Sequence, residues 1–190
     1  MKKLYGRTAL PLAVIALVVT GCTSTQGGTP SPAATTSSGA ASSDTSSAAP
    51  GGAATASLDP CSLLLASDLT SYGTFIGPNK REEFGARSCG YVTQVKNSSD
   101  PQMGVDVNIR DSQGVDTIND QGGGITQGKV NGRPSAMALG TPDLGICVLA
   151  LAVGTSSRVD VTITSATDTK QACDVAAKVA DNVEPRLPKG

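Results

Sequence analysis

"GICVLALAVGTSSRVDVTIT", residues 145–164, holds the two stretches that decide the fold. Residues 145–153 are apolar at nearly every position, which is typical of a strand that is buried on both faces at the centre of a sheet. Residues 158–164 alternate apolar with polar side chains, so we expect this strand to lie nearer a wet face. The two stretches predict a sheet whose neighbouring strands are joined in hairpins.

Further strands are predicted earlier in the chain. Residues 88–95, "SCGYVTQV", and residues 103–110, "MGVDVNIR", alternate between apolar and polar positions, and the second pattern is that of a half-buried strand. Asn131-Gly132 is the preferred two-residue hairpin turn, because both positions tolerate a positive φ. The segment from Pro78 to Arg87 is highly charged, and we expect a loop there.

Helices are expected at both ends of this strand-rich region. Asp59-Pro60 combines an N-cap with proline at the first helical position. The following residues, 62–73, predict a helix that is broken near Ser67 and ended by Gly73. An apolar stripe predicts a closing helix from about Thr169 to Val183. The predicted fold class is therefore α+β, a mostly antiparallel sheet covered by N- and C-terminal helices.

The first 21 residues have the layout of an export signal. Residues 1–7 carry three cations and no acid, and residues 8–19 carry no charge. A transmembrane helix needs about 20 apolar residues, and this apolar run is shorter. We therefore expect residues 1–21 to be a signal peptide, and an uncleaved membrane span is the weaker interpretation.

Residues 19–22, Val-Thr-Gly-Cys, resemble the lipobox of bacterial lipoproteins. In that family the cysteine thiol receives a diacylglycerol, and the signal is cut just before the cysteine. The resemblance implies that Cys22 carries acyl chains such as palmitate and holds the protein on the outer face of the cell membrane, because two or more chains give stable anchoring. An ordinary secretory signal with an incidental cysteine is the alternative.

The rest of the chain divides into a tether and one domain. Residues 23–57 consist of Ser, Thr, Ala, Gly and Pro at all positions but two, so residues 22–57 are expected to be a lipidated cysteine with a disordered tether. Residues 58–190 have the length of a single globular domain. Signal removal takes three of the 15 cations and none of the 16 anions, which leaves a net charge of −4 (12 against 16) and argues against nucleic acid as a partner.

Four cysteines remain when Cys22 is set aside, and an even number in an oxidising compartment indicates two disulfides. The chain contains no CxxC pair and no histidine, so a zinc site is disfavoured. Four cysteines allow three connectivities. We favour Cys61 with Cys89 and Cys147 with Cys173, because each bridge then joins a terminal helix to a strand across a modest loop.

A wider resemblance rests on several short segments together with the lipobox and the tether: "DPCSLL", "RSCGY", "VNGRPSA", "CVLALAVG" and "ACDVAAKVADNVEPRLP". In combination they look like the actinobacterial lipoproteins that are grouped as domain of unknown function 3558. The resemblance implies a disulfide-bearing lipoprotein of the cell envelope, with a fold related to the Mog1/PsbP-like α/β/α sandwiches. It implies no activity.

The sequence offers no convincing catalytic, cofactor or metal site. The absence of histidine excludes Ser-His-Asp and Cys-His nucleophile systems and histidine-ligated metals. "GGGITQGKV", residues 122–130, is close to a phosphate-binding loop, but Val130 stands where a hydroxyl is needed, so we expect a flexible glycine loop before a strand. Several acidic residues fit solvated turns and loops better than a calcium or acid–base site: Asp111, Asp116, Asp120, Glu82 and Glu83.

These observations favour a membrane-anchored, extracytoplasmic lipoprotein that acts as a non-enzymatic binding module of the cell envelope, with an envelope protein or a small ligand as its partner. The alternative is a carrier that encloses a lipid or small apolar ligand, because the small side chains of the closing helix leave room between layers. An enzyme is the third hypothesis.

Overall fold

The computed structural model describes residues 53–165 and 168–189. The predicted signal peptide, Cys22 and most of the predicted tether lie outside the described residues. Among the residues described, no helix is long and apolar enough to cross a membrane.

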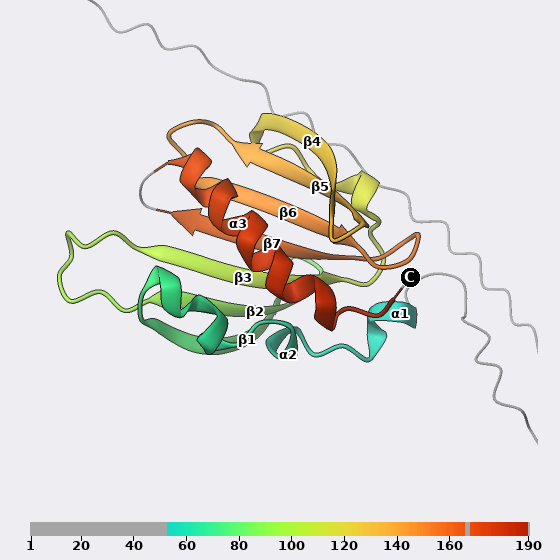
Figure 1. Ribbon diagram of the computed structural model, residues 1–190, viewed down its shortest axis with the longest axis horizontal. Helices are drawn as coiled ribbons and strands as arrows, with labels where there is room; N and C mark the ends of the chain where they lie inside the picture. Colours follow the sequence, from blue (N-terminus) through green and yellow to red (C-terminus); the bar gives the residue numbers. More distant parts are fainter. Residues whose placement is uncertain (1–52, 166–167, 190) are drawn as a thin grey trace, which may run out of the picture. The chain divides into compact units, whose positions relative to one another are not determined.

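One seven-stranded sheet with the order β1-β2-β3-β7-β6-β5-β4 forms the centre of the described part (Figure 1). Every neighbouring pair is antiparallel, as the sequence predicts. The strands are β1 (Phe75–Glu83), β2 (Ala86–Thr93), β3 (Met103–Arg110), β4 (Gly122–Val130), β5 (Arg133–Gly140), β6 (Ile146–Ala152) and β7 (Arg158–Ser165).

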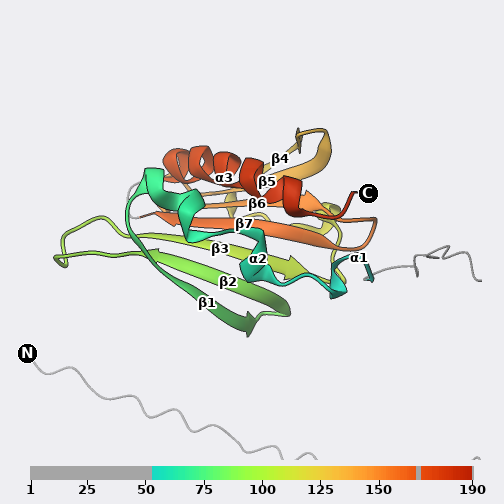
Figure 2. The same cartoon turned by 60° about the horizontal axis from the view of Figure 1, so that its bottom comes forward.

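Helix α3 (Thr169–Val183) runs across one face of the sheet, which we call the helix face, and Figure 2 shows this layer from the side. Short helices α2 (Pro60–Leu63) and η1 (Ala66–Tyr72) cover the same face, and the buried Tyr91 hydroxyl donates to the Leu64 carbonyl at 2.7 Å. The opposite face, which we call the open face, carries η2 (Val115–Thr117). The remaining short helices are α1 (Ala53–Ala56) and η3 (Glu184–Arg186).

Strand β6 is an interior strand, as predicted, but β7 lies deeper in the sheet than its alternating pattern suggests. Strand β6 lies inside the sheet, but β7 stands in the middle, between β3 and β6. Two of its polar side chains, Arg158 and Asp160, are buried, and they form an ion pair of 2.7 Å with each other. An alternating pattern indicates a wet face only when the polar residues find no partners inside the protein.

The prediction of a loop from Pro78 to Arg87 was wrong. These residues form most of β1 and the start of β2, joined by a tight turn in which Phe84 and Gly85 have φ values of 50° and 71°. Strand β1 lies at the edge of the sheet with most of its residues exposed, so it carries charges on both faces and shows no apolar alternation.

The N-terminal helix is shorter than predicted. Asp59 accepts a hydrogen bond from the Cys61 amide at 2.9 Å, as expected of an N-cap, but α2 ends at Leu63 and the backbone is extended at Leu64. The chain then forms η1, which ends at Tyr72 and is followed by Gly73, where φ is 130°. The break falls at Leu64 rather than Ser67 because the side chains of Leu63 and Leu64 are both buried in the core.

The predicted tether extends too far toward the C-terminus. Its last residues form α1, where the fully buried Thr55 donates a hydrogen bond to Asp111 at 2.7 Å. The Arg87 guanidinium donates to the Thr55 carbonyl at 2.7 Å. Small polar residues that look like a linker are thus part of the folded domain, because charged side chains far along the chain supply their partners.

Two disulfides join helices to strands on the helix face, and they are the two pairs that the sequence favours. Cys61 and Cys89 link α2 to β2 with a Cα–Cα distance of 5.1 Å, and Cys147 and Cys173 link β6 to α3 at the same distance. On the loop-entropy model, each bridge stabilises the fold by about 3.5 kcal/mol.

Candidate functional site

The helix face is hollowed between α3 and the hairpin formed by β4 and β5. Two adjoining hollows of about 400 Å³ each lie there, and Leu139 lines both. One extends from Leu139 along residues 126–131 to Ala177 on α3. The other lies at the N-terminal end of α3, between Gly123 and Pro142. We call the two hollows together the α3–β4 groove.

The groove exists because α3 covers β6 and β7 more closely than it covers the outer hairpin (Figure 1). Met137 and Leu139 of β5 are therefore only partly buried and form an apolar floor. The hairpin turns at Asn131 and Gly132, where φ is 49° and 89°, which confirms the predicted turn. Residues 122–124 begin β4 instead of forming a loop, so the expected glycine loop is wrong.

Charged side chains surround this apolar floor. On α3, Lys170 and Asp174 form an ion pair of 2.8 Å that is largely exposed to water. Its hydrogen bond raises the pKa of Lys170. Lys129 and Asp181 lie at the other end of the groove. An apolar floor with a charged rim is typical of a site that binds a ligand.

The N-terminal end of α3 is fixed in place beside the groove. The Thr169 hydroxyl donates to the Thr141 carbonyl at 2.7 Å and accepts from the Gly145 amide at 3.2 Å. The Cys147–Cys173 disulfide attaches the first turns of the helix to β6. This wall of the groove is therefore a rigid part of the fold.

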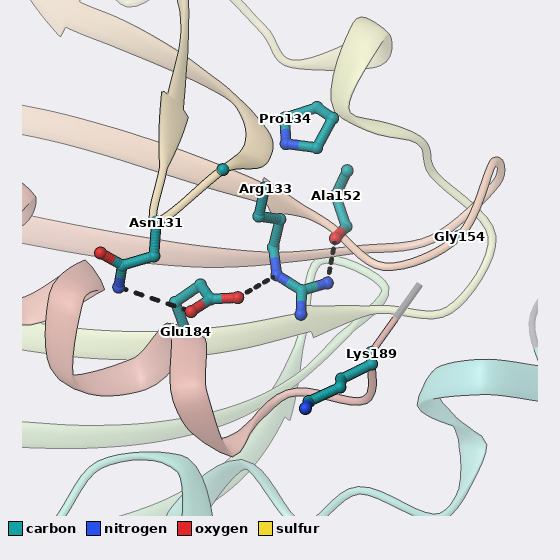
Figure 3. Close-up of a pocket in the computed structure, with 8 residues that line it drawn as sticks. Asn131, Arg133, Pro134, Ala152, Gly154, Glu184 and Lys189 are labelled. Atoms are coloured by element: carbon teal, nitrogen blue, oxygen red, sulfur yellow. Dashed lines mark hydrogen bonds and ion pairs between the residues drawn. The ribbon is translucent and has the colours of Figure 1, made fainter.

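A third hollow, of about 560 Å³, lies near the C-terminus around Arg133 (Figure 3). The Arg133 guanidinium donates to Glu184 and to the carbonyls of Ala152 and Pro188, each at 2.9 Å. The Arg133 side chain is only 8% exposed. Its nitrogen atoms hold η3 and the end of the chain against the hairpin, so Arg133 has a structural role.

The open face carries a network of paired charges. Asp160 accepts from Arg158 at 2.7 Å and from Arg110 at 3.3 Å, and Arg158 also donates to the Gly114 carbonyl at 2.9 Å. On the same face, burial raises the pKa of Asp106, although the ion pair with Arg81 opposes this shift. These charges have their partners within the chain.

The acidic residues singled out in the sequence are not brought together. Asp111 pairs with Arg87, Asp116 lies in η2, and Asp120 accepts from the Gly122 and Gly124 amides. Within residues 53–165 and 168–189, no cluster of three or more His, Cys, Asp or Glu is placed to hold a metal ion.

The two remaining candidates are the Glu82-Glu83 pair and the glycine-rich segment, and they lie on opposite edges of the sheet. Glu82 and Glu83 are neighbours on the edge strand β1, where Glu83 pairs with Arg81. The glycine-rich segment of residues 122–130 is the edge strand β4, so no helix follows it that could hold a phosphate.

Sequence reasoning missed the α3–β4 groove. The only available signal was that Met137 and Leu139 alternate with alanines in β5. The sequence does not reveal what these two side chains pack against. The groove depends on how far α3 reaches across the sheet, and the Cys147–Cys173 bridge and the contacts of Thr169 determine that position.

Comparisons with known proteins address the family of the chain. Searches among curated proteins and among solved structures found no match. A family model matches residues 17–186, and it therefore includes the whole sheet, α3 and both disulfides. The chain belongs to the family described as "Protein of unknown function (DUF3558)".

Proposed function

We propose that this chain is a membrane-anchored extracytoplasmic lipoprotein that acts as a non-enzymatic binding module of the cell envelope. The export signal and the lipobox cysteine Cys22 support the anchor. The two disulfides fit an oxidising compartment. The α3–β4 groove is the contact site in this proposal.

The observation that carries the binding role is the apolar floor of the groove. Met137 and Leu139 are left partly exposed within a folded core, and the rim carries charges of both signs. Apolar surface of this kind favours binding, because its removal from water contributes about 25 cal/mol per Å², from which the costs of association are subtracted.

Photo-crosslinking in living host cells tests this role. A photo-crosslinking amino acid replaces Ala177, which lines the groove, in the full-length chain. The matched control carries it at Lys178, the next residue of α3, which is exposed and does not line the groove. We expect a discrete crosslinked species from position 177 only. Equal labelling from both positions would contradict the groove as the contact site.

The second candidate function is a carrier of a lipid or small apolar ligand. The hollow at Gly123, Leu139 and Pro142 favours it, because its lining is mostly apolar. Native mass spectrometry of the chain purified from its own host tests this function. A carrier retains a bound mass that Leu139→Asp abolishes, whereas a ligand-free mass for the unaltered chain counts against a carrier.

We also propose that the fold is related to the Mog1/PsbP-like sandwiches. The single antiparallel sheet and the terminal helices support this kinship. The open face carries only η2 among the helices described, so a third layer is the feature to test. An experimental structure of the mature chain that shows two layers throughout would contradict an α/β/α arrangement.

A further inference from the structure

The outer edge of β4 is open to pairing with another strand. Val130 and Arg133 flank the two-residue turn and form a hydrogen-bonded pair, so the pairs made by Lys129, Gln127 and Ile125 are of the non-hydrogen-bonded kind. The amides and carbonyls of these three residues therefore point away from β5. The side chains of residues 125–129 are all exposed.

The opposite edge of the sheet is protected against such pairing. Strand β1 contains Pro78, which has no amide hydrogen, and its register is irregular between Ile76 and Asn79. Residues 80–83 are four consecutive charged residues. Proline, irregular register and charge are the devices that prevent strand addition. In β4, residues 125–130 contain no proline and a single charge, Lys129.

The charges along the β4 edge are complementary to those of a second copy. Lys129 lies at one end, and it makes no ion pair within the part of the chain that the structure describes. Asp120 lies at the other end, where its carboxylate accepts from the Gly124 amide at 2.9 Å, next to Ile125. An antiparallel copy related by a two-fold axis brings each Lys129 toward the Asp120 of its partner, at both ends at once.

We propose that β4 pairs with β4 of a second copy to form a two-fold dimer centred on Gln127. Gln127 then lies opposite its counterpart, and Ile125 lies opposite Lys129 of the other copy. The three outward-facing residues of each strand form backbone hydrogen bonds across the axis. No like charges lie directly opposite each other, and the two sheets become one continuous sheet.

The dimer completes the α3–β4 groove. Each copy supplies one wall, α3, and the paired hairpins supply a shared floor that runs from one helix to the other. The pairing involves few residues, so its affinity in dilute solution is low. Anchoring of both copies to one surface raises their effective concentration and favours the dimer.

Cysteine crosslinking of the full-length chain in intact host cells tests the register. Gln127→Cys places two thiols on residues whose Cα atoms are about 5.5 Å apart across the axis, which is within the range of a disulfide. We expect a reducible dimer of twice the chain mass on a non-reducing gel. A Gln127→Cys chain that stays monomeric while it forms both native disulfides would overturn the proposal.

Two matched variants show whether the contact is specific. Ile125→Cys lies on the same strand, but the proposed register separates its two Cα atoms by about 14 Å, too far for a disulfide. Lys80→Cys lies on the protected edge β1. Both chains are expected to remain monomeric. Equal dimer formation at positions 125 and 127, or an adduct of Gln127→Cys with a different protein, contradicts a dimer in this register.

A charge exchange at Gln127 provides a test without cysteine chemistry. Differently tagged full-length copies are expressed together, and their co-purification is measured. Gln127→Lys or Gln127→Glu in both copies places like charges opposite each other and lowers co-purification about fivefold. One copy with Lys and one with Glu restores it. Failure of the mixed pair to exceed both like-charged pairs would overturn the two-fold arrangement.

Discussion

At the scale of single residues, Asp68 and Arg186 join parts of the chain that are 118 positions apart. Arg186 donates to both carboxylate oxygens, at 2.6 and 3.1 Å, and also to the Leu63 carbonyl at 2.9 Å. The Asp68 side chain is 16% exposed and the Arg186 side chain is 32% exposed. This pair attaches the C-terminal η3 to the N-terminal helices on the helix face.

The Asp68–Arg186 pair makes stability depend on pH. The hydrogen bond from Arg186 lowers the pKa of Asp68 below its unfolded value of about 3.9. Its stabilisation is therefore fully present above about pH 4 and is lost as the pH falls through the folded-state pKa. We expect Asp68→Asn to reduce the free energy of unfolding by about 1–3 kcal/mol at pH 7, and by much less near pH 2.

Denaturant unfolding, followed by circular dichroism from pH 2 to pH 7, measures this difference. The matched control is Asp174→Asn, which breaks the exposed pair with Lys170 and is expected to change the free energy of unfolding little at any pH. A difference between wild type and Asp68→Asn that stays constant down to pH 2 would show that the carboxylate charge is not what stabilises the fold.

The proposed membrane anchor is attached to the thiol of Cys22, so replacement of this residue tests the anchor. Cys22→Ala in the full-length chain removes the group that would be acylated, and we expect the protein to leave the membrane fraction and to lose labelling by radioactive palmitate. Thr25→Ala, three residues along the predicted tether, should alter neither property. Palmitate labelling that persists in Cys22→Ala would contradict the assignment.

At the scale of elements, the position of α3 depends on its disulfide to β6. Cys147 and Cys173 are 26 positions apart, and Cys61 and Cys89 are 28 apart. Loop entropy therefore predicts nearly equal contributions from the two bridges. The Cys147–Cys173 bridge also holds α3, which is one wall of the α3–β4 groove.

Replacement of either disulfide by two serines tests this expectation. Cys147→Ser with Cys173→Ser should lower the free energy of unfolding by about 2–4 kcal/mol, and Cys61→Ser with Cys89→Ser should lower it by a similar amount. Chemical denaturation of both double variants gives the two values. A loss several times larger for one pair would show that packing around it, and not loop entropy, dominates its contribution.

Two of the elements that the sequence predicts have one wet face. Strand β3 matches the predicted residues 103–110, and α3 matches its apolar stripe from Thr169 to Val183. In both, burial on one side only produces a visible period. The Asn131-Gly132 turn was predictable because its local backbone requirement selects those residues.

Elements whose surroundings are set by distant parts of the chain were not predictable. Strand β1 is exposed on both faces, so no period marks it. Strand β7 lies in the middle of the sheet, and its buried Arg158 and Asp160 find partners in distant segments, the Gly114 carbonyl and Arg110. The groove likewise depends on the crossing position of α3, which no local pattern in the sequence reports.

At the scale of the whole molecule, the folded part begins earlier than composition indicates. Thr55 is fully buried, and both Arg87 and Asp111 bond to it. A chain that begins at residue 58, the predicted domain boundary, lacks Thr55, so Arg87 and Asp111 lose these hydrogen bonds. We expect it to be less stable than a chain that begins at residue 53 by about 1–3 kcal/mol.

Thermal and denaturant unfolding of the two truncated chains measure this difference. Asp111→Asn in the longer chain serves as the matched comparison, because it weakens the same contacts without removing α1. Equal stability of the two truncated chains would place residues 53–57 in the tether after all.

The two edges of the sheet also limit how large an assembly can become. Pro78 and the charges of residues 80–83 close one edge of every molecule, and the β4 edge is used up once it has paired with its counterpart. Addition of copies therefore stops at two, and the sheet cannot grow into a fibre. Crowding at a membrane surface would then produce discrete pairs, and a dense layer of these molecules would stay dispersed.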